Sequence, residues 1–406
     1  MNSLQRELIG LSNMNELPEE IKQLINNECD LSTLFKLSQT SKKNLNTYQQ
    51  LIFNKYEVNH INGLIFYDIR QMTKIKNINN ITDEEIKNLI NLTKLDLNDN
   101  NNITSTGIKH LTKLKFLSFG ENEQITDEGI KSLINLTNLN LGENTEITDE
   151  GLKNLTNLTY LNICYNTNLT NKLLKFLINL NELYLGSNQQ ISNEGIKNLI
   201  NLTKLNLGEN KQITDEGIKN LMNLNKLHLG CCEQITDEGI KNLINLTELH
   251  LNYNKNITDK GIINLINLTI LKLFVSTNIT DKGIINLRKL TYLSLGRNKQ
   301  ITNEGIKNLT NLTKLYLGCT ENITDEGLKN LINLTDLDLS YNEKITNEGI
   351  KNLTKLITIF LGSNKNITDE GLKNLTYLTN LDLGCNKNIT NIKFKNYSDH
   401  PFLLTM

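Results

Sequence analysis

Two histidines occupy positions at which they could share a metal ion. His228 and His250 stand 22 residues apart, and Cys231 lies close to the first of them. If they lie on adjacent parallel strands, about 4.8 Å separates them. Imidazole and thiolate are zinc ligands, but two histidines and one irregularly placed cysteine do not complete a ligand set. We therefore expect no bound metal and assign both histidines to a polar surface that contacts protein.

No other arrangement in the chain is typical of catalysis. There is no glycine-rich phosphate loop and no serine or cysteine nucleophile with a patterned histidine partner. Acidic pairs such as Asp237 and Glu238 recur in the repeats, where they suit a helix start, and we expect them on a solvated face. Arg297 is the one arginine expected on the strand face, so it is the candidate finger of a GTPase-activating solenoid. The sequence favours a protein that is not an enzyme and uses no cofactor.

A 22-residue repeat must position these residues. Residues 235–256, ITDEGIKNLINLTELHLNYNKN, are one of fourteen copies that run from residue 81 to residue 388 without insertion or deletion. The second half, Leu246-x-x-Leu249-x-Leu251-x-x-Asn254, resembles the leucine-rich repeat pattern. Leu249 and Leu251 are two residues apart and point to one face of a short strand, so the residues before and between them point the other way.

The first half of the repeat predicts a helix. Thr236 is placed as its N-cap and Asn245 as its end, because asparagine tolerates the left-handed conformation that follows many helices. The spacing i, i+3, i+4 predicts one buried apolar face. That face consists of Ile240, Leu243 and Ile244.

Two further columns of the repeat carry structural predictions. Glycine fills the fifth position in twelve of fourteen copies, with Glu85 and Leu173 in the others. Leucine would be costly in a left-handed conformation, so we expect helical geometry and a close approach of neighbouring helices. The asparagine column is substituted by Cys232, Ser276 and Thr320. All these side chains can donate, and we expect them to bond to a carbonyl of the adjacent repeat.

Stacked copies predict the fold class. Parallel strands pack about 4.8 Å apart and helices roughly 8–10 Å apart, so strands should lie on a concave side. We expect an α/β leucine-rich-repeat solenoid, a horseshoe of about fourteen strand–helix units, over residues 81–388. Residues 61–80 resemble a degenerate capping repeat, because Lys74-Ile75 echoes Lys94-Leu95. Residues 389–406 are predicted to form a C-terminal cap and tail.

Residues 1–60 do not follow the repeat and read as about three helices. Their motifs, Leu17-Pro18-x-Glu20-Ile21, then Asp30-Leu31, then Leu34 and Leu37-Ser38, resemble an F-box. Together with the repeats they resemble the F-box/leucine-rich-repeat proteins, especially the asparagine-rich versions of giant DNA viruses. The resemblance implies docking on a Skp-type adaptor of a cullin–RING ubiquitin ligase. The residues that it assigns to this contact are Leu17, Pro18, Ile21, Leu24, Leu31 and Leu34. The alternative is that residues 1–60 only cap the first repeat.

Composition limits the partners and the compartment. The net charge is −1 with both signs in each repeat, which argues against nucleic acid, and no apolar run is long enough for a membrane span. The six cysteines form no paired framework, and Asn-x-Thr sequons such as Asn245-Leu246-Thr247 place their middle residue in the core. We expect free thiols and a cytoplasmic or nuclear protein, of a host cell if the chain is viral.

The strand-face positions that the repeat leaves free are the candidate binding site. Tyrosines recur there, either because strands favour aromatic residues or because they form binding hot spots. The copy at 268–279 departs from the consensus with apolar residues, which indicates a contact site or drift in one repeat. The candidates are Tyr160, Tyr184, His228, His250, Tyr253, Ile270, Lys272, Phe274, Tyr292, Arg297 and Tyr316.

The function predicted from the sequence is that of an F-box-type substrate receptor. A target protein would bind the strand face while the N-terminal module binds the Skp-type adaptor. The alternative is a stand-alone repeat protein whose N-terminal helices only cap the solenoid.

Overall fold

The computed structural model describes residues 74–75, 82–87, 89–98, 100–276 and 278–390. The chain divides into two compact units, Met1–Leu158 and Thr159–Met406, which are described separately. The predicted F-box-like module at 1–60, most of the capping repeat at 61–80 and nearly all of the tail at 389–406 lie outside the described residues. No helix in the described part is long and apolar enough to cross a membrane.

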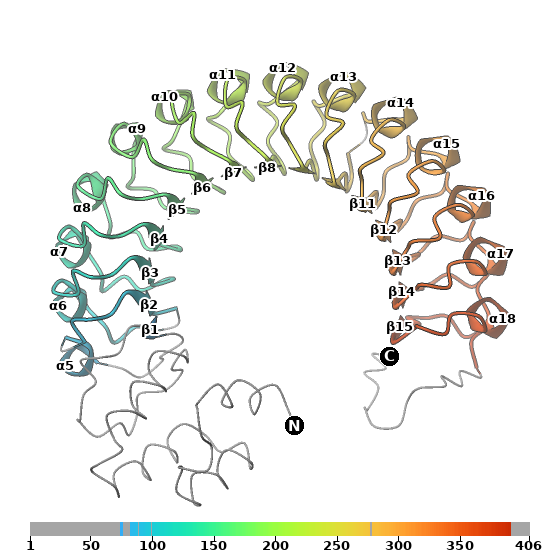
Figure 1. Cartoon of the computed structure of the whole chain (residues 1–406), viewed down its shortest axis with the longest axis horizontal. Helices are drawn as coiled ribbons and strands as arrows, with labels where there is room; N and C mark the ends of the chain where they lie inside the picture. The colour runs from blue at the N-terminus through green and yellow to red at the C-terminus, as the bar shows by residue number, and fades with distance from the viewer. Residues whose placement is uncertain (1–73, 76–81, 88, 99, 277, 391–406) are drawn as a thin grey trace, which may run out of the picture. The chain divides into compact units, whose positions relative to one another are not determined.

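The first unit alternates short strands with single-turn helices (Figure 1). Its strands pair in parallel and in chain order, and β1 pairs with β2 in the register Lys74 to Lys94 and Ile75 to Leu95, as their sequence echo indicates. The strands are β1 Lys74–Ile75, β2 Lys94–Asp96, β3 Phe116–Ser118 and β4 Asn138–Asn140. The helices are α5 Asp83–Ile86, α6 Ser105–Ile108, α7 Asp127–Ile130 and α8 Asp149–Leu152.

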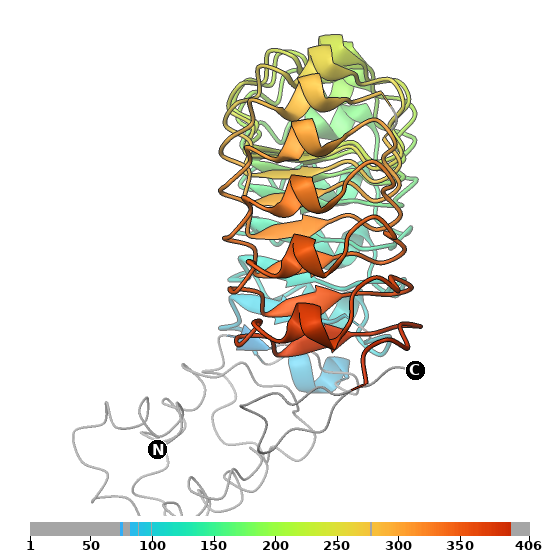
Figure 2. The same cartoon turned by 90° about the vertical axis from the view of Figure 1, so that its right-hand side faces the viewer.

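The second unit continues the same pattern, with each strand paired in parallel to the strand of the next repeat (Figure 2). Its strands lie on the inner side of its curve and its helices on the outer side (Figure 1). The strands are β5 Tyr160–Asn162, β6 Glu182–Tyr184, β7 Lys204–Asn206, β8 Lys226–His228, β9 Glu248–His250, β10 Ile270–Lys272, β11 Tyr292–Ser294, β12 Lys314–Tyr316, β13 Asp336–Asp338, β14 Thr358–Phe360 and β15 Asn380–Asp382. The helices are α9 Asn171–Leu174, α10 Asn193–Ile196, α11 Asp215–Ile218, α12 Asp237–Ile240, α13 Asp259–Ile262, α14 Asp281–Ile284, α15 Asn303–Ile306, α16 Asp325–Leu328, α17 Asn347–Ile350 and α18 Asp369–Leu372.

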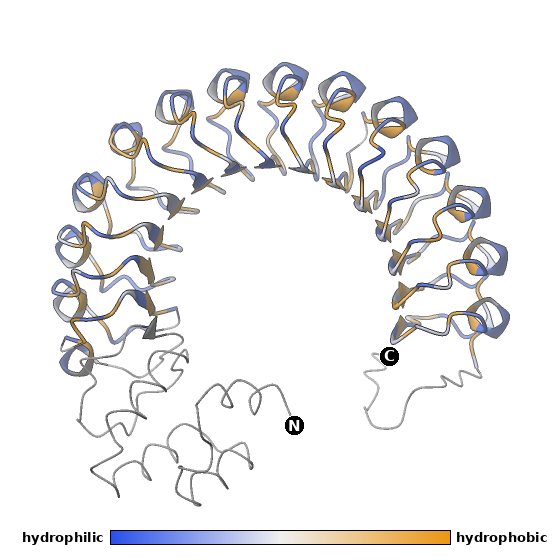
Figure 3. Ribbon diagram, viewed as in Figure 1, coloured by the Kyte–Doolittle hydropathy of each residue, from blue (hydrophilic) through white to orange (hydrophobic). Residues whose placement is uncertain are grey.

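The core of each unit lies between its strands and its helices, where apolar segments face one another (Figure 3). Leu249 and Leu251 are fully buried, as the alternation along the strand predicts, and so are their counterparts in most repeats. Solvent-accessible side chains occupy the other face of the strands. The predicted solenoid fold is confirmed for both units, and one strand face of each is free of the core.

The predicted helix is too long. Thr236 is its N-cap, since its side chain accepts a hydrogen bond from the amide of Glu238, but α12 ends at Ile240 and its C-cap is Lys241 in a right-handed conformation. Leu243 is buried while Ile244 is 56% exposed. The chain turns after one helical turn, so the 3.6-residue period that would bury Ile244 does not continue. Asn245 does not end the helix; its Nδ2 donates to the carbonyl of Met222 at 2.9 Å.

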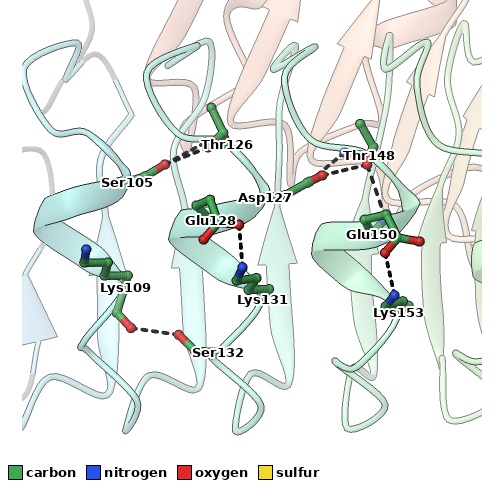
Figure 4. Close-up of polar contacts among 10 residues, drawn as sticks. All are labelled: Ser105, Lys109, Thr126, Asp127, Glu128, Lys131, Ser132, Thr148, Glu150 and Lys153. Carbon is green, nitrogen blue, oxygen red and sulfur yellow. Dashed lines mark hydrogen bonds and ion pairs between the residues drawn. The ribbon is translucent and has the colours of Figure 1, made fainter.

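An aspartate at the first position of a helix joins neighbouring repeats, which corrects its assignment to a solvated face. Asp237 accepts from the amide of Thr258 at 2.8 Å with Oδ1 and from its hydroxyl at 2.7 Å with Oδ2. Figure 4 shows the same contact in the first unit, between Asp127 and Thr148. The second acidic residue does face solvent, where Glu238 pairs with Lys241 at 2.6 Å.

The glycine and asparagine columns behave largely as predicted. A Cβ at Gly261 would lie 2.5 Å from Oδ1 of Asp237 on the preceding helix, so glycine is required by close approach and not by a left-handed backbone. Asn254 donates to the carbonyl of Cys232 at 2.8 Å, one repeat away. Cys232 and Ser276 also donate to the preceding repeat. Thr320 differs, because its hydroxyl donates at 2.7 Å to Leu317 of its own repeat.

Candidate functional site

The free strand face of the second unit carries the candidate residues. Eight of them stand at the first or third position of strands β5, β6 and β8–β12, and these positions are half-buried between the side chains of adjacent strands. They are Tyr160, Tyr184, His228, His250, Ile270, Lys272, Tyr292 and Tyr316. Tyr253, Phe274 and Arg297 lie in the turns that follow β9, β10 and β11. The strand face of the second unit therefore holds eight of the eleven, and the other three lie in the turns at the ends of its strands.

Tyrosines on this face form pairs across neighbouring strands. Tyr160 and Tyr184 have ring centroids 5.2 Å apart, and Tyr292 and Tyr316 have the same separation. Burial, with the neighbouring Tyr184 and Glu182, raises the pKa of Tyr160 to about 12. Burial also raises the pKa of the other three phenols. These hydroxyls therefore stay protonated near neutral pH and present hydrogen-bond donors beside apolar rings.

The copy at 268–279 is accommodated by its neighbours. The Phe274 ring meets the edge of Tyr253 at 5.4 Å, and the Arg297 guanidinium lies 5.9 Å from its centre. A Cβ at Gly296 would lie 2.6 Å from a Phe274 ring carbon, so the ring occupies the space that this glycine leaves. Phe274 is consequently half-buried against its neighbours.

Residues directly before the asparagine column share an unusual backbone conformation. Tyr253, Val275 and Arg297 all have φ near +60°. This left-handed conformation is unfavourable for a β-branched residue such as Val275 and costs on the order of 1–3 kcal/mol. The amide of Val275 donates to the carbonyl of Gly296 at 2.9 Å, one of the inter-repeat bonds that hold the turn.

The two histidines lie closer together than strand spacing alone predicts. Their rings stack with centroids 3.8 Å apart and planes inclined by 9°. Glu248 places Oε1 at 2.9 Å from Nε2 of His250 and at 3.5 Å from Nε2 of His228, and its Oε2 lies 2.8 Å from the Lys226 ammonium. Nε2 of His250 is buried and, within the described part of the chain, has no hydrogen-bond partner, although Oε1 of Glu248 approaches it to 2.9 Å. Among the described residues, Glu248 and not Cys231 completes this group.

Burial governs the protonation of the histidines. It lowers the pKa of His250 to about 4, with help from His228 and Lys272, and it lowers the pKa of His228 as well. For Glu248, burial acts to raise the pKa, but the hydrogen bond and charge of Lys226 outweigh it and the net shift is downward. Two neutral imidazoles and one carboxylate therefore converge at neutral pH.

Sequence reasoning missed Glu248 as a member of this group. The available signal was its position two residues before His250, which places both side chains on one face of β9. It also missed a row of exposed apolar side chains at the tenth repeat position, beyond the helices. This row in the second unit contains Ile178, Ile200, Met222, Ile244 and Ile266.

Comparison with known proteins agrees with this architecture. A leucine-rich repeat family model matches residues 88–111, 110–134, 132–155, 177–200, 198–222, 220–244, 242–266, 286–309, 308–332 and 330–354, together more than half of the chain. No curated protein sequence matches the chain.

Solved structures of repeat proteins are also similar. An internalin, InlF of Listeria monocytogenes, is 31% identical with a TM-score of 0.56, and the alignment covers 77% of this chain and 90% of that one. A leucine-rich repeat protein of Leptospira interrogans is 30% identical with a TM-score of 0.57, covering 79% and 86%. The Toll–Spätzle complex of Drosophila, at 18% identity, 79% and 48% coverage and a TM-score of 0.56, shows the fold alone. The chain belongs to the leucine-rich repeat family.

Proposed function

We propose that the strand face of β5–β12 binds a protein partner and that the chain acts as an interaction scaffold and not as an enzyme. The carrying observation is the series of half-buried ring pairs along this face, Tyr160–Tyr184, His228–His250 and Tyr292–Tyr316. Tyrosines held by their neighbours lose little side-chain freedom on binding and are common at interface hot spots.

Size and charge also suit a protein partner. Eight strands at about 4.8 Å spacing extend over roughly 34 Å, enough for an interface of about 800 Å² per partner. Ion pairs cross between adjacent strands. Lys204 pairs with Glu182 of the preceding strand at 2.7 Å, and Lys314 pairs with Asp336 of the following strand at 3.3 Å. This mixed charge does not favour a polyanion. Leucine-rich repeat proteins generally mediate protein–protein interaction, and the Toll structure is a complex with Spätzle.

The test is affinity capture followed by binding measurements with the purified partner. A Tyr292→Ala/Tyr316→Ala variant should raise Kd at least about tenfold, because it removes one of the two tyrosine pairs of this face. Tyr377→Ala is the matched control, since Tyr377 is an exposed tyrosine outside the strands. Equal affinity of the double variant and the unchanged protein for every captured partner would contradict the proposal.

We further propose that residues 17–56 recruit a Skp-type ubiquitin-ligase adaptor, so that the strand face selects its target. The support is the F-box-like pattern around Leu17, Pro18 and Leu31. A Leu17→Asp/Pro18→Ala variant should lose the purified adaptor and keep the strand-face partner. If the unchanged chain fails to bind the adaptor, the stand-alone alternative replaces this role. Deleting residues 1–60 would then lower the stability of the repeats and leave partner binding intact.

We place this role in the cytoplasm or nucleus. The described cysteines are free thiols. Nδ2 of Asn245, the acceptor atom of one sequon, donates a hydrogen bond to the carbonyl of Met222, and a glycan on this atom would disrupt that contact. Microscopy of the tagged full chain in the expressing cell tests this placement, and accumulation in secretory compartments would contradict it.

A further inference from the structure

We propose that His228, Glu248 and His250 form a binding site for a divalent transition metal ion on the strand face. Their ligand atoms lie within 4.8 Å of one another. Two imidazoles and one carboxylate are a ligand set that zinc and related ions accept, with a remaining position for water or a further ligand. This assignment revises the expectation of no metal and does not depend on the proposed protein-binding function.

The distances suit a single ion. Zinc bonds of about 2.0–2.2 Å in tetrahedral geometry place neighbouring ligand atoms roughly 3.3–3.5 Å apart. Oε1 of Glu248 lies 2.9 Å from one Nε2, below that range, and 3.5 Å from the other, at its upper limit. The ion could therefore be bound without movement of strands β8 and β9, which the parallel ladder holds in register.

The buried Nε2 of His250 supplies an independent reason. A buried nitrogen without a hydrogen-bond partner is unfavourable, and few such groups occur in folded proteins. Oε1 of Glu248 already lies 2.9 Å from this nitrogen, so a shared cation would stand between two groups that the fold brings together. The carboxylate is already oriented, because Lys226 holds Oε2 at 2.8 Å and leaves Oε1 toward the histidines. A metal ion at Oε1 would satisfy the nitrogen.

Binding requires one change in the side chains. The ring planes are inclined by only 9°, whereas both nitrogens must point toward a common ion. His228 is the ring that can tilt, since its side chain is 30% exposed and that of His250 only 14%. The change is a side-chain rotation on an accessible face.

Lys272 opposes the ion and provides a sharp test. It pairs in register with His250 on β10, so its positive charge stands one strand away from the proposed ligands. Like charge nearby weakens cation binding. Replacing Lys272 with methionine should therefore tighten metal binding, an effect that chance binding elsewhere on the chain would not show.

The experiment is zinc titration of the chelator-stripped full chain by calorimetry, with cobalt absorption as a second readout. The unchanged chain should bind one ion at this site. His250→Ala and Glu248→Gln should each weaken binding by about tenfold or more, since loss of an outer-shell partner alone weakens metal sites by about 10–100-fold. Lys272→Met should strengthen binding.

Matched controls separate this site from adventitious binding. Glu182→Gln alters the equivalent strand position on β6, where Lys204 and not a histidine pair faces the carboxylate. His110→Ala alters an exposed histidine of the first unit. Both should leave the affinity unchanged. Unchanged affinity in folded His250→Ala and Glu248→Gln proteins, or a loss caused by Cys231→Ser instead, would overturn the assignment.

Discussion

At the scale of single residues, an aspartate that the sequence pattern assigned to the solvated surface accepts hydrogen bonds that join neighbouring repeats. The amide and hydroxyl of Thr258 both bond to Asp237, while Gly261 leaves the space that this carboxylate fills. Asparagine performs the same task elsewhere. Asn193 accepts from the amide of Thr214 at 2.9 Å and donates to its hydroxyl at 2.9 Å. The position therefore requires an oxygen acceptor and not a charge.

The need for an oxygen acceptor at position 237 predicts the effect of substitutions there. Asp237→Ala should lower the free energy of unfolding by about 1–3 kcal/mol, because the Thr258 amide loses its partner. Asp237→Asn should change it by less than about 0.5 kcal/mol. Urea denaturation of the full chain measures both. Equal losses in the two variants would show that the charge, and not the acceptor, is what matters.

The close approach of Gly261 predicts a coupling between two positions. Gly261→Ala should destabilise the protein, since its Cβ would lie 2.5 Å from Oδ1 of Asp237. In an Asp237→Ala background this clash is absent, and the same change should be much less costly. A double-mutant cycle measures the difference. Simple additivity of the two losses would refute the explanation.

The Tyr160 phenol provides a test of pH dependence. Its pKa of about 12 lies above its ordinary value of 10.0, so folding favours the protonated form. The resulting stability is complete below pH 10 and is lost as the pH rises toward about 12, because the unfolded chain ionises first. Tyr160→Phe cannot ionise. The urea midpoint of the unchanged protein should fall relative to that of Tyr160→Phe as the pH rises from 10 toward 12, and a constant difference would contradict the assignment.

At the scale of elements, the helix is shorter than its apolar pattern suggests. The four-residue α12 buries Ile240, and the turn that follows buries Leu243 but exposes Ile244. Helix dipole and propensity contribute little to so short an element. Its position depends on caps, turns and the hydrogen bonds to its neighbours.

Substitutions at the adjacent residues Leu243 and Ile244 should therefore differ sharply in their effect on the free energy of unfolding. Leu243→Ala should cost about 2–5 kcal/mol through loss of buried volume. Ile244→Thr should lie within about 0.5 kcal/mol of the unchanged protein, and threonine already stands at this position in other repeats, as at Thr310. Thermal and urea unfolding compare them. A large loss in Ile244→Thr would mean that this side chain packs after all.

At the scale of the molecule, stability within each unit arises from contacts between successive repeats. Side-chain bonds from Asn254, Asn245 and Asp237 each reach a residue 21 to 23 positions away. Such an array is quasi-one-dimensional, so its stability is a sum of repeats and their interfaces. The stacking of successive repeats also brings side chains that are far apart in the sequence together on one strand face.

Removal of one whole repeat should be tolerated for this reason. Deleting residues 301–322 brings Ile323 into the place of Ile301 and restores every register. We expect cooperative unfolding with a Tm lowered by no more than about 4 °C. Deleting residues 301–311 is the control, and it should weaken the native circular dichroism of the chain and remove the cooperative transition. Equal behaviour of the two deletions would contradict a strict repeat register.

The sequence by itself determined the 22-residue period, the parallel register and the burial of residues such as Leu249, because every repeat places the residue at a given position in the same surroundings. It also predicted the N-cap at Thr236 and the inter-repeat bond of Asn254. Only the tertiary structure decided where Ile244 lies, which hydrogen bonds Asp237 accepts, and that Glu248 joins the two histidines. These outcomes depend on distances and directions between side chains of successive repeats, and a one-dimensional pattern does not contain them.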